Sequence, residues 1–370
     1  MNFIPRRVAF GLKYIWLNFL NRELQSKVLC RLSKAHLLRR TISFEDEIHR
    51  FKKILIILPE RTYDAAIVQS VFSSLKLKKG ALVEVVAESD AKDLIKSNPD
   101  VDGGFFFSAR EYRYNHPAFI ELCNAIQQKS YDICFLMKQD AGPLDLLLAA
   151  VTKAPLRVGF PSNSAFPFLN LCIRPSKKTE QEKDKYESML RALGIKILRG
   201  KIAWNLPRTA DKDAEGVIAE TGVHLSNRIV GINLTPAVTG QSFPIQLLKD
   251  IIAELESEEG VSTVLFHAGY SNDEEAELAQ AVGRKSINYP PHHITFAAAL
   301  SKKLPVVITL NNLYYQISAM TGNKVLGLFE SLEHRRWSSF EAGKLELLSA
   351  VKLEKIDTKE IKSKVLELLA

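Results

Sequence analysis

The stretch ILIILPERTYDAAIVQSVFSSLKLKKGALVEVVA, residues 54–87, decides the fold class. An apolar run at 54–58 is followed by a polar turn, an amphipathic helical pattern over 64–76 and a second apolar run at 81–87. Apolar runs of this length on either side of a helix indicate neighbouring parallel strands that are buried on both faces. The stretch therefore predicts a strand-helix-strand unit.

The same alternation continues through most of the chain. Further strands are predicted at 104–107, 131–137, 157–160, 229–234, 262–267, 305–310 and 324–329, and further helices from 91, at 117–129, 143–152, 244–257, 273–282, 294–302 and 312–321 and after Asp357. A charged stretch at 174–185 and a helix that ends at Leu193 separate two such series. We therefore expect two doubly wound α/β domains, with a ligand cleft at the carboxyl ends of their strands.

These patterns give the expected division of the chain. It consists of a basic amphipathic helical segment (1–47), an N-terminal Rossmann-like domain (48–206), a C-terminal Rossmann-like domain (207–345) and a C-terminal crossover helix (346–370).

Composition narrows the class of protein. Hydrophobic residues make up 46% and charged residues 25% of the chain, which is ordinary for a globular protein and excludes collagen, coiled coil and extended disorder. The four cysteines form no C-x-x-C pair, so neither a zinc site nor a disulfide framework is expected. A reducing, cytoplasmic setting fits this usage.

The net charge of +8 lies entirely in the first 53 residues, which hold 12 Lys or Arg and 4 Asp or Glu. Aromatic and aliphatic residues share this segment, but Lys13 interrupts its apolar part, so a membrane-spanning helix is not expected. We expect residues 1–40 to lie on an anionic membrane surface, which makes the protein peripheral on the inner face of the cytoplasmic membrane. The alternative is a helix that packs on the protein's own body. No nucleic-acid partner is expected, because the rest of the chain is electroneutral.

Several motifs of catalysis are absent from the sequence. There is no G-x-G-x-x-G after the first strand, no P-loop, no G-x-S-x-G and no H-E-x-x-H. His292 and His293 are adjacent, but no third ligand accompanies them. We therefore expect neither a cofactor nor a metal.

Several short segments of the sequence, in their order along the chain, resemble those of the family nine glycosyltransferases. This family includes the heptosyltransferases of lipopolysaccharide core assembly. The resemblance runs from about Lys53 to Leu369. It is carried by Ile54–Leu58 with Asp64 after it, Asn98–Asp102, Tyr131–Ile133, Ala154–Phe160, Tyr186–Gly194 and Phe243–Pro244. It implies the two-domain GT-B fold and an inverting enzyme that moves a sugar from a nucleotide-sugar donor to a lipid-linked saccharide acceptor.

The resemblance also implies site residues. Asp64 matches the position of the family's general base, although Tyr63 replaces the usual preceding glycine. A carboxylate suits the removal of a proton from the acceptor hydroxyl, but a carboxylate at the start of a helix is also common as a cap without any chemistry. Asp140, in the loop after the strand at 131–137, is a second candidate for contact with the acceptor.

The donor side departs from the family pattern. Gln241 stands near the position of a basic residue, and Asn311 to Gln316 (NNLYYQ) replace an Asp-Thr/Ser-Gly-x-x-His signature. Amides can still cap a helix or donate hydrogen bonds. The candidate donor-binding residues are Asn233, Thr235, Gln241, His267, Asn311, Asn312 and Gln316.

The altered signature leaves two further interpretations open. The protein is either a glycosyltransferase with altered donor contacts or a catalytically degenerate family member that acts as a binding or scaffold subunit on the membrane surface. An unrelated nucleotide-binding α/β protein is a third possibility.

Overall fold

A computed structural model describes residue 25 and residues 43–78, 80–175, 181–198, 204–223, 228–269, 271–290, 293–330 and 345–370. Most of the predicted basic segment, and His292, lie outside the described residues. The chain divides into two compact units, one built mainly from residues before 199 and the other mainly from residues 199–370. Each unit contains one six-stranded sheet.

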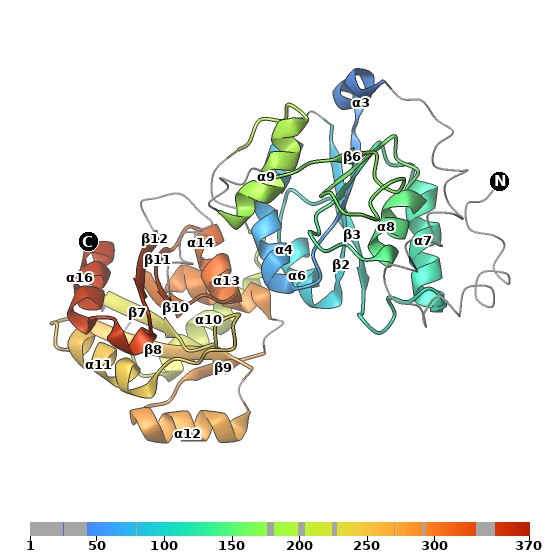
Figure 1. Ribbon diagram of the computed structural model, residues 1–370. Helices are drawn as coiled ribbons and strands as arrows, with labels where there is room; N and C mark the ends of the chain where they lie inside the picture. Colours follow the sequence, from blue (N-terminus) through green and yellow to red (C-terminus); the bar gives the residue numbers. More distant parts are fainter. Residues whose placement is uncertain are drawn as a thin grey trace. The chain divides into compact units, whose positions relative to one another are not determined.

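The first sheet is parallel throughout and has the order β3-β2-β1-β4-β5-β6. Its strands β2, β3 and β6 are labelled in Figure 1. Its strands are β1 (Lys53–Ile57), β2 (Leu82–Glu88), β3 (Gly103–Phe107), β4 (Ile133–Leu136), β5 (Leu156–Gly159) and β6 (Leu171–Cys172). The central strands β1 and β4 are formed by apolar residues that are buried on both faces of the sheet, as the sequence pattern predicts.

Helices of the first unit connect these strands. They are α3 (Phe44–Arg50), α4 (Thr62–Val68), η2 (Gln69–Val71), α5 (Phe72–Lys76), η3 (Ser89–Ala91), α6 (Lys92–Lys96), α7 (Pro117–Lys129), α8 (Pro143–Val151) and α9 (Glu182–Ala192). The helices α7 and α8 bury Phe119, Ile126 and Leu148 in one core with Leu55 and Leu136 of the sheet. The helix predicted at 64–76 is divided, because a 3-10 turn separates α4 from α5.

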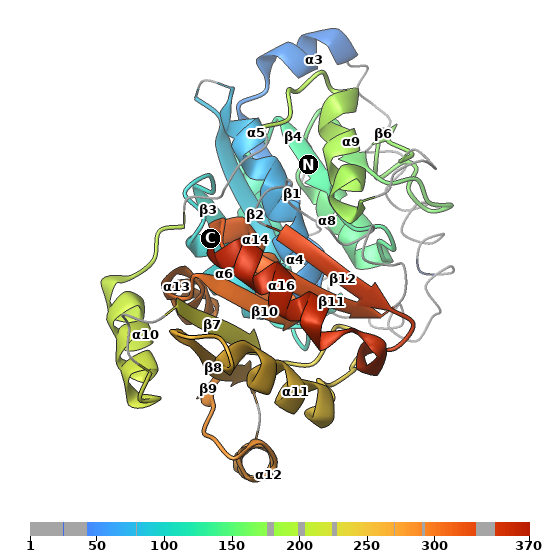
Figure 2. The same ribbon diagram turned by 90° about the vertical axis from the view of Figure 1, so that its left-hand side faces the viewer.

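The second sheet is also parallel and has the order β12-β11-β10-β7-β8-β9 (Figure 2). Its strands are β7 (Arg228–Asn233), β8 (Val261–Ala268), β9 (Ile287–Tyr289), β10 (Val306–Leu310), β11 (Lys324–Glu330) and β12 (Leu345–Ala350). The unit's helices are α10 (Arg208–Glu220), α11 (Ile245–Glu256), α12 (Asn272–Val282), α13 (Ile294–Lys303), α14 (Leu313–Thr321), η5 (Leu353–Lys355) and α16 (Thr358–Leu369).

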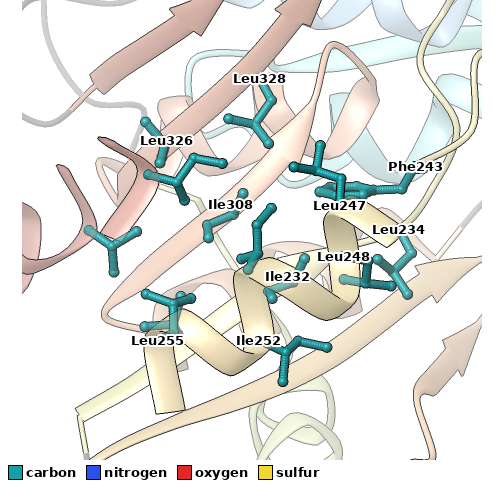
Figure 3. Packing of buried hydrophobic residues seen from close by; sticks show 14 of the residues in the cluster. Ile232, Leu234, Phe243, Leu247, Leu248, Ile252, Leu255, Ile308, Leu326 and Leu328 are labelled. Carbon is teal, nitrogen blue, oxygen red and sulfur yellow. The ribbon is translucent and has the colours of Figure 1, made fainter. Parts of the chain in front are cut away.

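The apolar face of α11 packs on this sheet (Figure 3). Leu247, Leu248 and Leu255 from the helix meet Ile232 of β7 and Ile308 of β10. The helix α16 adds Ile361, Val365 and Leu368 to the same core. Residues 346–370 therefore pack on the second unit, and β12 extends its sheet beyond the expected domain end at residue 345.

The two sheets have one topology. In each, the first strand lies beside the fourth, so the chain reverses its direction of winding between β1 and β4 and again between β7 and β10. In such sheets ligands bind at the carboxyl ends of the strands next to this reversal. The predicted doubly wound α/β class is confirmed, and this topology fixes where a site is sought in each unit.

Candidate functional site

At the reversal point of the second sheet, Asn312 joins the ends of β7 and β10. Its Nδ2 donates to Oδ1 of Asn233 at 2.9 Å and to the carbonyl oxygen of Thr235 at 2.8 Å. Its Oδ1 accepts from the backbone N–H of Tyr315 at 3.1 Å and thereby caps α14. The Asn312 side chain is buried and holds three parts of the protein together, so its role here is structural.

Two more of the predicted donor residues are buried as well. His267 is the second-to-last residue of β8, and its Nε2 lies 2.8 Å from the hydroxyl of Ser286. Burial lowers the pKa of His267, so the ring is neutral near pH 7. Gln316 is fully buried inside α14. Neither side chain is exposed to a ligand that stays at the protein surface.

Other predicted residues reach an open pocket. A pocket of about 550 Å³ lies at the carboxyl ends of β10 and β11, and Gln241 and Asn311 contribute to its wall. Glu330 also lines it, and its carboxylate accepts from Nε2 of Gln241 and, at 3.3 Å, from the backbone N–H of Leu353. Thr235 is partly buried, and its hydroxyl accepts from the backbone N–H of Ala268 at 2.9 Å.

The pocket wall is polar but carries no positive charge among the described residues. Its polar members are Thr239, Gly240, Gln241, Asn311 and Glu330. Because the only charged group is a carboxylate, this wall offers hydrogen bonds rather than charge neutralisation to a diphosphate. Arg335 and Arg336, the next basic residues along the chain, lie outside the described residues.

In the first unit, Asp64 lies in the first turn of α4, directly after β1. Its Oδ2 accepts from Nε of Arg61 at 2.7 Å, and 16% of its side chain is exposed. The helix begins earlier than the sequence predicted, so the N-cap residue is Arg61 and Asp64 is the third residue of the helix. Asp64 therefore does not occupy the N-cap position. Its carboxylate still interacts favourably with the positive end of the helix dipole.

Asp140, the predicted acceptor contact, is exposed in the loop after β4. Two residues before it, Lys138 is buried, with 9% of its side chain exposed. The Lys138 ammonium donates to Glu60 at 2.7 Å and to Asp145 at 2.8 Å. Asp145 is itself fixed by the hydroxyl of Tyr112 at 2.8 Å and by the backbone N–H of Gly142 at 2.7 Å.

Sequence reasoning missed this cluster of Lys138, Glu60, Asp145 and Tyr112, which we call the Lys138 cluster. It joins the loop after β1 to the loop after β4, so it occupies the reversal point of the first sheet. A buried ion pair contributes little net stability. The loss of one of its partners is strongly destabilising, because the other charge is then left buried without compensation. Buried charged groups at the carboxyl ends of parallel strands next to a reversal point mark a candidate functional site.

No group of His, Cys, Asp and Glu among the described residues has the arrangement of a metal site. Within the same part of the chain, no helix combines the length and apolar composition that crossing a bilayer requires.

No protein-family model matches the chain, and no curated protein matches it. Several solved structures match the chain. The glycosyl transferase family 9 protein from Veillonella parvula DSM 2008 superposes with a TM-score of 0.75 at 17% identity, over 86% of this chain and 97% of that chain. This chain has the GT-B fold of that glycosyltransferase.

Two heptosyltransferases from E. coli have the same fold. The ADP-heptose LPS heptosyltransferase II gives a TM-score of 0.69 at 15% identity and covers 86% of this chain and 98% of its own. Heptosyltransferase WaaC, solved with ADP-2-deoxy-2-fluoro heptose, gives 0.62 at 14% identity and covers 85% and 99%. The resemblance that the sequence suggested is thus confirmed at the level of fold, over nearly the whole of each relative.

Proposed function

We propose that the protein is an inverting glycosyltransferase that moves a sugar from a nucleotide-sugar to a saccharide acceptor. The observation that carries this proposal is the position of Asp64, a partly exposed carboxylate in the first turn of the helix that follows the first strand of a GT-B fold. Asp64 accepts the proton of the acceptor hydroxyl while the hydroxyl oxygen attacks the anomeric carbon, and the nucleotide diphosphate leaves from the opposite side. The E. coli heptosyltransferase WaaC has been solved with ADP-2-deoxy-2-fluoro heptose and with ADP, which supports a nucleotide-sugar donor.

We assign the open pocket of the second unit as the binding site of the nucleotide-sugar donor. Gln241 and Asn311 supply amide groups to it, and Thr235 lies on the same loop as Gln241. Because hydrogen bonds from neutral amides replace charge in this wall, we expect weaker binding of a nucleoside diphosphate than a lysine or arginine would give. Asn233, His267, Asn312 and Gln316 are buried in the second unit and do not line this pocket.

We assign a lipid-linked saccharide as the acceptor and the inner face of the cytoplasmic membrane as the location. The basic and aromatic composition of residues 1–40 supports this assignment. Sedimentation with anionic vesicles that high salt reverses would support it further, whereas equal retention by neutral vesicles would contradict it.

The test of the enzymatic proposal has two arms. In the first, a panel of nucleotide-sugars is screened for a rise in Tm, and at least one donor should raise it. In the second, transfer from that donor to lipid-linked saccharides is measured for the wild type and for Asp64→Asn. The substitution should reduce transfer about 10²- to 10⁴-fold without changing the donor-induced shift. The absence of a shift with every donor, or full activity of Asp64→Asn, would refute the proposal.

A second candidate is a family member that binds a sugar nucleotide or a partner without catalysis. The burial of Asn312 and Gln316 favours it, because these positions of the family's signature here serve the interior of the second unit. A donor that raises the Tm but is never consumed, together with a partner protein that is lost when residues 1–47 are deleted, would favour this candidate.

A further inference from the structure

The open pocket of the second unit contains the carboxylate of Glu330, the last residue of β11. Its Oε1 accepts two hydrogen bonds, one from Nε2 of Gln241 and one, at 3.3 Å, from the backbone N–H of Leu353. Both contacts reach the same oxygen, so among the described residues Oε2 is left for a ligand of the pocket. The protein thus fixes an anionic oxygen in the wall that we assign to the donor.

The loop after β7 forms another part of this wall and is held in place by its backbone. The N–H of Gly240 donates to the carbonyl oxygen of Ala237 at 2.8 Å, and the N–H of Val238 donates to that of Asn311 at 2.8 Å, which ties the loop to the end of β10. Gly240 has a φ of +85°, and no described heavy atom beyond its chain neighbours would lie within 4 Å of a Cβ there. The wall is therefore fixed and has open space in front of it.

A nucleotide-sugar brings further negative charge to this wall. Both phosphates of its diphosphate are ionised at neutral pH, and the carboxylate of Glu330 repels them. Among the described residues, no lysine, arginine or histidine lines the pocket. Neutral amides do not compensate the charge of a diphosphate, so this wall suits a diphosphate that arrives with its own cation.

Mg²⁺ and the similar Mn²⁺ are the cations that match these groups. Mg²⁺ keeps several of its waters and is usually bound through one or two carboxylates together with substrate phosphates, rather than by a cage of protein ligands. One carboxylate in an open pocket therefore suffices, because the diphosphate supplies the other anionic ligands. Such a site needs no cluster of metal-binding side chains, and the described residues contain none.

We propose that this pocket binds the diphosphate of its nucleotide ligand as a complex with Mg²⁺ or Mn²⁺, and that Oε2 of Glu330 is a ligand of the cation. The inference rests on the proposed function, which assigns the pocket to a nucleotide-sugar. It departs from the expectation, drawn from sequence motifs, that no metal takes part. In the proposed transfer reaction the cation also offsets the charge that develops on the leaving diphosphate, so transfer requires it.

The test measures nucleotide binding rather than turnover. Isothermal titration calorimetry is performed on the full chain with ADP, UDP and GDP, in magnesium chloride and, at the same ionic strength, in EDTA. At least one nucleotide should bind roughly tenfold or more tightly with Mg²⁺. Glu330→Gln should abolish this dependence, because the anionic ligand of the cation is lost. In EDTA this variant should bind the nucleotide at least as tightly as the wild type, because the repulsion is also lost.

Two further variants control for charge and for folding. Glu354→Gln removes the same charge from an exposed residue outside the pocket wall, and it should leave the Mg²⁺ dependence unchanged. Glu330→Lys places an ammonium group in the pocket, so in EDTA it should bind the nucleotide more tightly than the wild type. Glu330→Gln keeps an oxygen that can accept from Gln241 and Leu353, so the test stays valid even if Glu330→Lys fails to fold.

Four results would overturn the cation site. They are no binding of any nucleotide in either buffer, equal affinity in magnesium chloride and in EDTA, Mg²⁺ dependence that persists in Glu330→Gln, and binding in EDTA that is lost in Arg335→Gln or Arg336→Gln. The last result would assign the compensating charge to an arginine.

Failure of the cation site can be distinguished from failure of the proposed function. Sugar transfer that proceeds in EDTA would refute the cation site and leave the transferase proposal intact. Mg²⁺-dependent nucleotide binding that requires Glu330, in a protein that transfers no sugar, would support the cation site and refute the transferase.

Discussion

The two sheets of this protein have the same strand order but differ in the chemistry of their reversal points. In the first unit an ion pair, Lys138 with Glu60, joins the loops after β1 and β4. In the second unit the amide of Asn312 joins the equivalent strand ends, β7 and β10, through Asn233 and Thr235. One topology therefore supports both a charged edge and a neutral edge.

The difference teaches what each edge is suited to do. In the second unit the buried amide of Asn312 donates to two oxygens and accepts from one backbone N–H, so it stabilises the strand ends and the start of α14. In the ion pair of the first unit, the Lys138 side chain is buried whereas 55% of the Glu60 side chain is exposed, so this pair lies at the boundary between the core and solvent. The charged edge therefore depends on an ion pair that solvent reaches on one side, and the neutral edge depends on buried amide hydrogen bonds.

Removal of Asp145 should have the largest effect on stability. Asp145→Ala leaves the buried ammonium of Lys138 with one partner, Glu60, and exposes it to a poorly solvated environment. Breaking a buried ion pair in this way costs about 3 to 5 kcal/mol of unfolding free energy. Urea denaturation followed by circular dichroism measures this loss.

Asp140→Ala is the matched control for that experiment. The residue lies in the same loop but is exposed, so its substitution should change stability by no more than about 0.5 kcal/mol. Equal midpoints for the two variants would show that the Lys138 cluster contributes nothing to the first unit.

Asn312→Ala should have the next largest effect, because it breaks the neutral edge. The helix α14 loses its N-cap hydrogen bond, and the carbonyl of Thr235 loses a donor. A lost cap and an unsatisfied buried acceptor together cost roughly 2 to 4 kcal/mol. Differential scanning calorimetry should show a lower Tm, whereas Asn311→Ala, in the partly exposed neighbour, should change it little.

The sequence predicted the central strands well because they are apolar runs between helices, as in Ile54–Leu58. Edge elements were missed for physical reasons. The strand β9 has only three residues, β12 alternates Leu with Glu346, and α10 is largely polar and contains Gly216. Such elements form because they pack against or hydrogen-bond to neighbouring strands and helices. A local sequence pattern does not reveal these contacts.

Some residues of the candidate site could likewise be predicted from the local sequence, and others could not. Asp64 could be found because it lies next to the first strand in the sequence. Glu60 and Lys138 are 78 residues apart, so only the fold brings them together. A local signal did exist, since Lys138 directly follows the apolar run 131–137 and Asp145 interrupts a run of leucines in α8. Charged residues in apolar surroundings require partners, and this requirement marks them for attention.

Opposite responses to pH should distinguish the two edges, with the smallest effect of the three. At the charged edge burial raises the pKa of Glu88, so the folded protein binds this proton more tightly than the unfolded chain, and stability falls as pH rises above about 4.5. At the neutral edge burial lowers the pKa of His267, so the unfolded chain binds its proton more tightly, and stability falls as pH drops below about 6.5.

Glu88→Gln should therefore raise the Tm slightly at about pH 8 and leave it unchanged at about pH 4, where the carboxyl group is protonated in both states. His267→Gln should reduce the loss of Tm between about pH 6.5 and pH 5, although the exchange also costs packing at every pH. The pH dependence of each variant, relative to its own Tm at neutral pH, separates titration from packing. A variant whose Tm follows the wild type in parallel across this range would show that its side chain does not titrate differently in the folded protein, and that the two edges do not differ in the way proposed.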